Sequence, residues 1–403
     1  MSGIESSRIY FDHAATTAIS PRALAVVAEE MATLGNPSSL HHDGRRVRDQ
    51  VEGAREGIAL HLGCTPSEVI FTGSGTEANN SAIKGLFWYH HPRKVIISTP
   101  IEHHAVHDPI QWLVEHEGAI LREVRVSREG AIDIDHLEEL IRSHHDEIAL
   151  ISLIHTNNEL GTSITLDEMS RIRKVIGELP LHLDAVQSIG KVDFNFAAMG
   201  ATSVAISAHK VGGPLGVGAL ILRRGLEITP LLHGGGQERD IRSGTLNAPG
   251  IVGFATALEE SILELNDRRA KVLGLRQRLI DGVKKSIPEV QVNGRGDAPG
   301  IINLTFPGTE NEASLLLFDA RGISCSTGSA CSQGLAQPSH VLLAIGLSES
   351  EVNSSLRFSL SHLNTEAEVD VFISLVDHVI AGAKAAHQAK LPSVKLPSVK
   401  APS

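Results

Sequence analysis

The feature that most constrains the fold is an alternation, from about residue 66 to 225, of short apolar β-rich runs with segments of helical periodicity. This alternation is typical of a parallel sheet that helices cover on both faces. Most of the runs end in small or polar residues, and parallel sheets bind ligands at those carboxyl ends. We expect strands at 68–72, 94–98, 147–154, 181–184, 203–207 and 218–222.

A smaller α+β segment follows. A helical pattern from about 250 to 287, which we expect Gly274 and Gly282 to break, connects it to the first part. Beyond this connection the pattern predicts strands at 301–306 and 356–360, a helix at 313–320 and a closing helix from about Thr365.

The predicted fold class is therefore α/β, with a large domain whose central sheet is mainly parallel and a smaller α+β domain. We assign 1–20 to an N-terminal segment near the small domain, 21–250 to the large domain and 251–388 to the small C-terminal domain. The motif LPSVK occurs twice near the end of the chain, and the low apolar content there predicts an unfolded tail over 389–403.

Composition excludes several classes of protein. The net charge is −11, and no run rich in Lys or Arg is present, which argues against direct binding to nucleic acid. The chain lacks a signal-peptide pattern and any apolar run of bilayer-spanning length, so we expect a cytoplasmic protein without membrane contact. No HExxH motif or paired Cys/His spacing occurs, and no metal site is expected. Cys64 and Cys325 have the character of small buried apolar residues.

A strand, a loop of small residues and a helical pattern follow one another in FTGSGTEANNSAIKG, residues 71–85. Glycines let backbone N–H groups approach a phosphate, the helix N-terminus adds its dipole, and the Thr76 hydroxyl can donate a hydrogen bond. The segment matches neither the P-loop nor the dinucleotide-binding fingerprint. It therefore indicates an anion site only in combination with other features.

Two strand ends carry residues suited to a cofactor. Asp184 and Gln187 follow one apolar strand, and Ser207, His209 and Lys210 follow another. Lys210 could simply form a salt bridge with Asp184. Alternatively, a partly desolvated lysine can form an imine with pyridoxal phosphate (PLP), while the aspartate pairs with the protonated pyridine nitrogen. Several compatible residues at one edge of the sheet favour the second interpretation.

Further candidates lie in loops. His103 and Asn158 are expected at the same edge of the sheet, where a histidine can stack on a cofactor and move a proton. Cys331 lies in a polar stretch, where a thiol can ionise and carry a persulfide. Arg357 could clamp a carboxylate through two hydrogen bonds, although most arginines form structural ion pairs.

A series of motifs spanning nearly the whole chain resembles the cysteine desulfurase family, group I (NifS and IscS type), within the class V PLP-dependent aminotransferase superfamily. These motifs are DHAATT (12–17), GNPSSLH (35–41), FTGSGTEANN (71–80), EHHAV (102–106), NNELG (157–161), DAVQSIGK (184–191), SAHKVGGPLGVG (207–218), HGGGQER (233–239), RSGT (242–245), STGSAC (326–331) and LRFSL (356–360).

The resemblance implies the aspartate-aminotransferase-like fold (fold type I), bound PLP and a homodimer. It also implies an activity, in which L-cysteine becomes L-alanine and the sulfur passes to an enzyme cysteine as a persulfide. An acceptor protein such as an iron–sulfur cluster scaffold would then receive the sulfur. Thiolation of tRNA and phosphorothioation of DNA remain open as alternative destinations.

By this resemblance, Lys210 matches the imine-forming lysine and Asp184 the partner of the pyridine nitrogen. Gln187 matches the residue that hydrogen-bonds the phenolic oxygen of the cofactor. His103 matches the stacking histidine, and Asn158 matches an asparagine near cofactor and substrate.

The resemblance also assigns Arg357 to the substrate carboxylate and Cys331 to the sulfur. Thr245 matches a residue that reaches the phosphate of the neighbouring subunit. The phosphate cup would comprise Gly75, Thr76, Ser207 and His209.

The alternatives are a selenocysteine lyase or aminotransferase of the same fold, or a non-catalytic scaffold that retains it. The scaffold interpretation predicts that Lys210, Asp184 or Cys331 would be replaced, and all three are present. Ala208 and Gln237 depart from the usual family motifs, and His104 and Cys325 are assigned no role.

Overall fold

A computed structural model describes residues 8–328 and 337–390. Its central element is a seven-stranded sheet with the order β2-β8-β7-β6-β5-β3-β4, in which only β8 runs antiparallel to its neighbours. The predicted α/β class and each predicted strand of this sheet are confirmed, and the sequence missed only the edge strand β4. The strands are β2 (Val69–Thr72), β3 (Val95–Ser98), β4 (Ile120–Glu123), β5 (Ile148–Ile154), β6 (Leu181–Asp184), β7 (Ser203–Ser207) and β8 (Gly218–Leu222).

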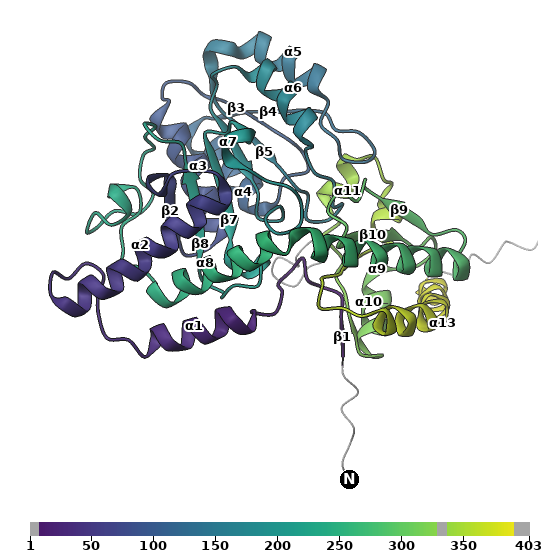
Figure 1. Cartoon of the computed structure of the whole chain (residues 1–403). Helices are drawn as coiled ribbons and strands as arrows, with labels where there is room; N and C mark the ends of the chain where they lie inside the picture. The colour runs from purple at the N-terminus through teal and green to yellow at the C-terminus, as the bar shows by residue number, and fades with distance from the viewer. Residues whose placement is uncertain (1–7, 329–336, 391–403) are drawn as a thin grey trace, which may run out of the picture.

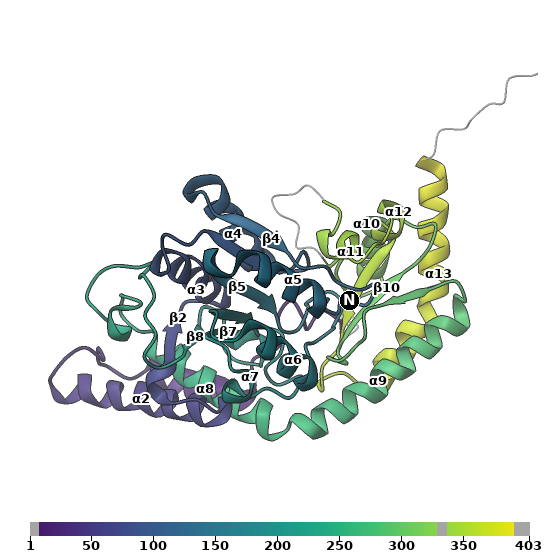
Figure 2. The ribbon, with the colours of Figure 1, turned by 90° about the horizontal axis from the view of Figure 1, so that it is seen from above.

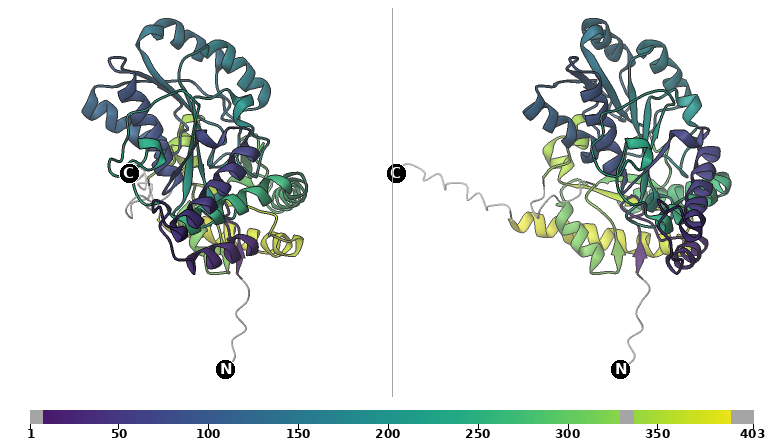
Figure 3. Two further views of the ribbon diagram at one scale, coloured as in Figure 1. Left: turned by 60° about the vertical axis from the view of Figure 1, so that its left-hand side comes forward. Right: turned by 90° about the vertical axis from the view of Figure 1, so that its left-hand side faces the viewer.

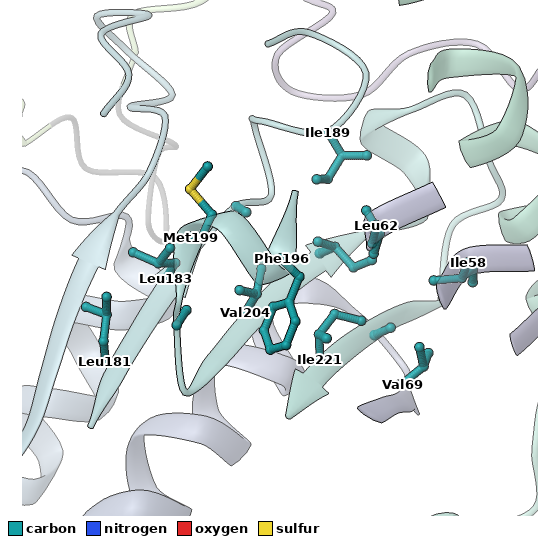
Figure 4. Packing of buried hydrophobic residues seen from close by; sticks show 14 of the residues in the cluster. Ile58, Leu62, Val69, Leu181, Leu183, Ile189, Phe196, Met199, Val204 and Ile221 are labelled. Carbon is teal, nitrogen blue, oxygen red and sulfur yellow. The ribbon is translucent and has the colours of Figure 1, made fainter. Parts of the chain in front are cut away.

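Helices cover both faces of the sheet because alternate strand residues point to opposite sides. In β2, Ile70 faces helices α3 (Gly75–Tyr89) and α4 (His104–Glu117), whereas Val69 and Phe71 belong to the core on the other face. Figure 3 shows the sheet between these two layers, and Figure 4 shows side chains of the second core. That core is covered by α1 (Pro21–Met31), α2 (His42–Leu62), α5 (Ile134–His144), α6 (Leu166–Ile176), α7 (Phe196–Met199) and α8 (Ala248–Leu263).

The helical connection between the two parts of the molecule differs from the sequence expectation. It consists of α8 and α9 (Leu265–Ser286), which meet at Glu264 (Figure 1). The prediction that Gly274 and Gly282 break the helix is wrong, since both lie inside α9. Gly282 is needed there for packing, because a Cβ atom at this position would come within 2.3 Å of the Ile373 side chain.

A second, smaller core lies beside the first (Figure 2). Its antiparallel sheet has the order β12-β10-β9, and β1 pairs in parallel with β11. Phe358 lies at its centre, where its ring contacts those of Phe306, Phe318 and Phe372. The elements of this core are β1 (Ile9–Tyr10), β9 (Gln291–Asn293), β10 (Ile301–Thr305), α10 (Asn311–Asp319), β11 (Ile323–Ser324), β12 (Ser355–Ser359) and α13 (Glu366–Lys390). The short helices α11 (His340–Ala344) and α12 (Glu349–Val352) instead pack in a separate small cluster with Ile101, Ile154 and Leu160.

Two boundaries expected from the sequence, the domain boundary at 250 and the start of the tail at 389, fall inside helices of the structure. Residue 250, the expected domain boundary, lies inside α8, whose buried residues belong to the large core, while those of α9 belong to the small core. Helix α13 extends to Lys390, beyond the expected start of the tail at 389, and the remainder of that tail lies outside the described residues. Within the described residues, no helix has both the length and the apolar character needed to span a membrane.

A buried ion pair anchors the loop that follows β8. The Arg55 guanidinium donates to both carboxylate oxygens of Glu238, at 2.7 and 2.9 Å, and the backbone N–H of Phe71 donates to the same carboxylate at 2.6 Å. Glu238, Arg239 and Asp240 all have positive φ, which is unfavourable for residues with a Cβ atom. The ion pair therefore holds a strained turn against the sheet.

Glu238→Ala is expected to lower the free energy of unfolding by about 3 kcal/mol, because it removes the buried carboxylate and leaves Arg55 paired only with the half-exposed Glu52. Urea denaturation measures this change. The matched control is Glu289→Ala, which breaks an exposed pair with Lys384 and should have a much smaller effect. Equal effects of the two variants would contradict the anchoring role.

Candidate active site

A pocket of about 630 Å³ lies at the carboxyl ends of β5, β6 and β7, between the large and small cores. The structure brings nearly all the predicted site residues to this pocket. Thr245 is exposed and does not line it, and Cys331 lies outside the described residues. The predicted residues that line it are Gly75, Thr76, His103, Asn158, Asp184, Gln187, Ser207, His209, Lys210 and Arg357.

The N-terminus of α3 forms one end of the pocket. The Ser74 hydroxyl caps the helix by accepting from the Glu77 N–H, while the N–H groups of Gly75 and Thr76 have no partner within a helix that begins here. A Cβ atom at Gly75 would come within 2.8 Å of Val186 and 3.1 Å of Ser207. Only glycine keeps this approach open, and the free N–H groups with the helix dipole suit a phosphate.

The Asp184 carboxylate is buried at the end of β6. It accepts hydrogen bonds from the Val186 N–H at 3.0 Å and from Asn79 Nδ2 at 3.1 Å. His182 Nε2 lies 2.8 Å from Asn79 Oδ1 and, as the donor, fixes the orientation of that amide. Burial nevertheless raises the pKa of Asp184 to about 6. A cationic ligand beside the carboxylate, such as a protonated pyridine nitrogen, would lower the pKa of Asp184 again because it stabilises the ionised form.

The Lys210 amine donates to the carbonyl oxygens of Ala14 and Ala15, each at 2.6 Å. No ion pair in the described chain joins Lys210 to Asp184, so the simple salt-bridge interpretation is wrong. Burial and the nearby Arg357 charge lower the pKa of Lys210 to about 8. The amine thus has a substantial neutral fraction near neutral pH, as a nucleophile or base requires.

Gln187 is held from both sides. Its Nε2 donates to the Ala14 carbonyl at 2.7 Å, and its Oε1 accepts from the partly buried Lys191 amine. Burial, together with the charges of Lys210 and Arg357, lowers the pKa of Lys191 to about 7. The sequence analysis assigned no role to Lys191. Lys191 is the last residue of the DAVQSIGK motif, four residues after Gln187. This position in the motif is the sequence feature that could have pointed to a role for Lys191.

His103 begins α4 and caps it, because its Nδ1 accepts the Ala105 N–H at 3.0 Å. Burial and the Lys210 charge lower the pKa of His103 to about 4, so the ring is neutral. With Nδ1 occupied as an acceptor, the ring proton lies on Nε2. His103 therefore presents a hydrogen-bond donor at Nε2.

Arg357 enters the pocket from β12 in the small core. Its guanidinium donates to Asp12 Oδ1 at 2.9 Å and to the Asn158 carbonyl at 3.0 Å. Arg357 Nε and Asn158 Oδ1 are buried without a hydrogen-bond partner. The backbone of Arg357 also exchanges hydrogen bonds with Ser326, in the STGSAC motif. Asp12, in the DHAATT motif, had no role in the sequence analysis, and only the fold shows that it orients the arginine.

These residues fit PLP. A helix N-terminus suits the phosphate, a buried carboxylate suits the pyridinium nitrogen, and the partly neutral amine of Lys210 suits the aldehyde. The unpaired Arg357 Nε and Asn158 Oδ1 offer polar partners for a bound amino acid. The N–H groups at the start of α3 have no partner within the helix, and neither the Asp184 carboxylate nor the Lys210 amine has an ion-pair partner in the described chain. PLP would therefore supply partners that these groups lack.

The aminotransferase class-V family model matches residues 9–372, and the chain belongs to this family of PLP-dependent enzymes. It is 46% identical over 384 residues to the IscS-like cysteine desulfurase of Mycobacterium tuberculosis, covering 94% of this chain and 97% of that protein. A solved NifS-like protein superposes with a TM-score of 0.86 at 35% identity, covering 93% of this chain and 99% of the other. The solved structure titled SspA in complex with cysteine superposes with a TM-score of 0.77 at 34% identity, covering 89% of this chain and 100% of the other. Within its class the chain is a cysteine desulfurase, and its cofactor is PLP.

Glu102, next to His103, is a further pocket residue that the sequence analysis did not assign. Its Oε1 accepts from the Thr99 hydroxyl at 2.6 Å and from the Ile154 N–H at 2.8 Å, while its Oε2 is buried without a partner. Burial raises the pKa of Glu102 to about 8, so the native protein holds a proton that the unfolded chain releases at a lower pH.

Because this pKa is raised, the stability that Glu102 contributes is present at acid pH and is lost as pH rises toward about 8. Glu102→Gln, which cannot ionise, should remove this loss. We expect the free energy of unfolding of the cofactor-free wild type to fall relative to the variant by up to about 1.4 kcal/mol per pH unit in this range. Urea titrations at several pH values measure the difference. Parallel curves would contradict a protonated Glu102.

Proposed function

We propose that the pocket around Lys210 is the site at which L-cysteine is converted to L-alanine and its sulfur is passed to Cys331. The observation that carries this assignment is the convergence on one pocket of Asp184 from the end of β6, Lys210 from the turn after β7, and Arg357 from β12. Bound PLP supplies an electron sink for negative charge at the substrate α-carbon. The protein residues bind the amino acid, orient it and move its protons.

Arg357 holds the substrate carboxylate in this proposal. Its Nε is unpaired, and the ion pair with Asp12 fixes the plane of the guanidinium. A planar guanidinium can donate two parallel hydrogen bonds to a carboxylate, which determines how the amino acid faces Lys210. The neighbouring Asn158 Oδ1 is available to accept a hydrogen bond from the substrate.

Lys210 Nζ is the better candidate to accept the α-proton. Its lowered pKa gives it a neutral fraction, whereas His103 already carries its proton at Nε2 and uses Nδ1 to cap α4. His103 therefore covers the cofactor ring and donates from Nε2. Gln187, held by Lys191, donates to the phenolic oxygen.

Cys331 receives the sulfur. Its thiolate forms an S–S bond with the substrate sulfur as the substrate C–S bond breaks, and the β-carbon keeps the bonding electrons and gains a proton. The products are alanine and a persulfide on Cys331. Burial raises the pKa of both Cys64 and Cys325 to about 12, so neither thiol ionises readily enough to replace Cys331.

The wider assignments follow from the same proposal. A homodimer would let the exposed Thr245 reach the phosphate in the partner's pocket. The persulfide would pass to an acceptor protein such as an iron–sulfur scaffold, in the cytoplasm. We also propose two domains that divide at the α8–α9 junction, with residues 1–20 beside the smaller one.

Lys210→Ala should lose the visible absorbance of bound PLP and all desulfurase activity, because the cofactor loses its covalent link. Cys331→Ser should keep the absorbance and release no sulfide from cysteine. Absorbance spectra, with assays of alanine and sulfide, measure both outcomes, and assays with selenocysteine or a keto acid test the alternative activities. A Cys331→Ser protein with wild-type desulfurase activity would remove Cys331 from the mechanism.

Arg357→Lys keeps the charge but loses the two-pronged geometry, so it should raise KM for cysteine about tenfold or more, corresponding to about 1.4 kcal/mol. Steady-state kinetics measure the change. The control is Arg295→Lys, in an ion pair with Glu168 outside the pocket, which should leave KM unchanged. An unchanged KM in Arg357→Lys would indicate that this arginine has only a structural role.

A further inference from the structure

A cluster of potential metal ligands lies at the rim of the active-site pocket. The first turns of α4 place His104, His107 and Asp108 on one side of the helix. The Nδ1 atoms of the two histidines lie 3.0 and 3.2 Å from Asp108 Oδ1. One potential ligand atom from each of the three residues lies within 4.8 Å of the others. This separation is close to that of ligands around one small cation.

A further histidine lies beside this group of three, although it is not among the residues whose ligand atoms all lie within 4.8 Å of one another. The His340 ring, at the start of α11, lies 5.0 Å from the His104 ring and 5.6 Å from the His107 ring, between centroids. His340 Nε2 lies 2.8 Å from the Glu102 carbonyl oxygen, which can only accept. In the neutral ring, Nε2 therefore carries the proton and Nδ1 keeps a lone pair. A ring that donates one N–H to a backbone carbonyl is the arrangement that orients histidine ligands in metal sites.

The cluster supplies the ligand types that an ion of the zinc type binds, namely imidazole nitrogens from His104, His107 and His340 and a carboxylate oxygen from Asp108.

The cluster is accessible from solvent. The side chains of His104 and Asp108 are 43% and 66% exposed, whereas Asp184 deeper in the same pocket is buried. An ion can therefore reach the rim without entering the space for PLP. Another exposed cluster, His41, His42 and Asp43, has longer N···O separations of 4.0 and 3.6 Å and no fourth histidine beside it in the described chain.

We propose that His104, His107, Asp108 and His340 form a binding site for a divalent ion of the zinc type. On binding, the protons that now join His104 and His107 to Asp108 move from Nδ1 to Nε2, and the freed Nδ1 atoms coordinate the ion. His340 contributes its Nδ1. The ion would then link α4 on the large sheet to α11, which follows the Cys331 segment in the chain. This assignment replaces the expectation that the chain has no metal site.

Co²⁺ is a suitable probe because tetrahedral coordination gives it visible absorbance. The experiment titrates Co²⁺ into the PLP-loaded Cys331→Ser protein, in which the Cys331 thiol cannot compete as a ligand, and follows binding by calorimetry and difference absorbance. We expect one saturable site per chain. Adding His107→Ala or His340→Ala should weaken binding about tenfold or more.

The matched control is His42→Ala, which removes a histidine from the other exposed cluster and should leave Co²⁺ affinity unchanged. X-ray absorption at the cobalt edge of the Co²⁺-loaded protein should show only nitrogen and oxygen ligands. Absence of saturable binding, or equal affinity in the His107→Ala protein, would overturn the site. Unchanged affinity in the His340→Ala protein alone would overturn its assignment as the fourth ligand.

Discussion

Repulsion among partly buried cations is the interaction on which the rest of the site depends. Lys191, Lys210 and Arg357 lie close enough to affect one another, and burial together with this repulsion lowers the pKa of both lysines. The carboxylates of Asp12 and Asp184 oppose this effect at Lys210 but do not outweigh it. Repulsion of this kind favours anionic ligands in a low-dielectric site. A phosphorylated cofactor and a substrate carboxylate both supply the missing negative charge.

The large and small cores meet at this charge network, so the packing of each core influences the chemistry. Arg357 projects from β12, whose buried neighbours include the phenylalanine cluster around Phe358. Its guanidinium reaches Asp12 and the Asn158 carbonyl, and its backbone bonds to Ser326 near the Cys331 segment. A shift of β12 would therefore move the Arg357 guanidinium and Ser326 together. In the function proposed above, the strand that positions the substrate is thus also bonded to the motif that contains Cys331.

The sequence predicted the central sheet well because its buried strands are apolar on both faces and end in small or polar residues. It missed β4, whose exposed and half-buried residues give no apolar run. It placed the helix break at Gly274 and Gly282, where glycine instead permits close packing. Among site residues it found those at strand ends and in motifs. Asn79, Glu102 and Lys191 were missed because their roles depend on contacts between residues distant in sequence or on burial, and neither is visible in local patterns.

Helix α4 shows how one local structure can serve two chemical purposes. The hydrogen bond from Ala105 N–H to His103 Nδ1 starts the helix and also fixes the proton of His103 on Nε2. A histidine held in this way can take up a second proton only if the cap is broken, which costs helix stability as well as desolvation. The same helix then directs His104, His107 and Asp108 away from the buried cofactor space toward the rim. The adjacent residues His103 and His104 therefore have different surroundings, because His103 caps the helix at the pocket whereas the His104 side chain is 43% exposed.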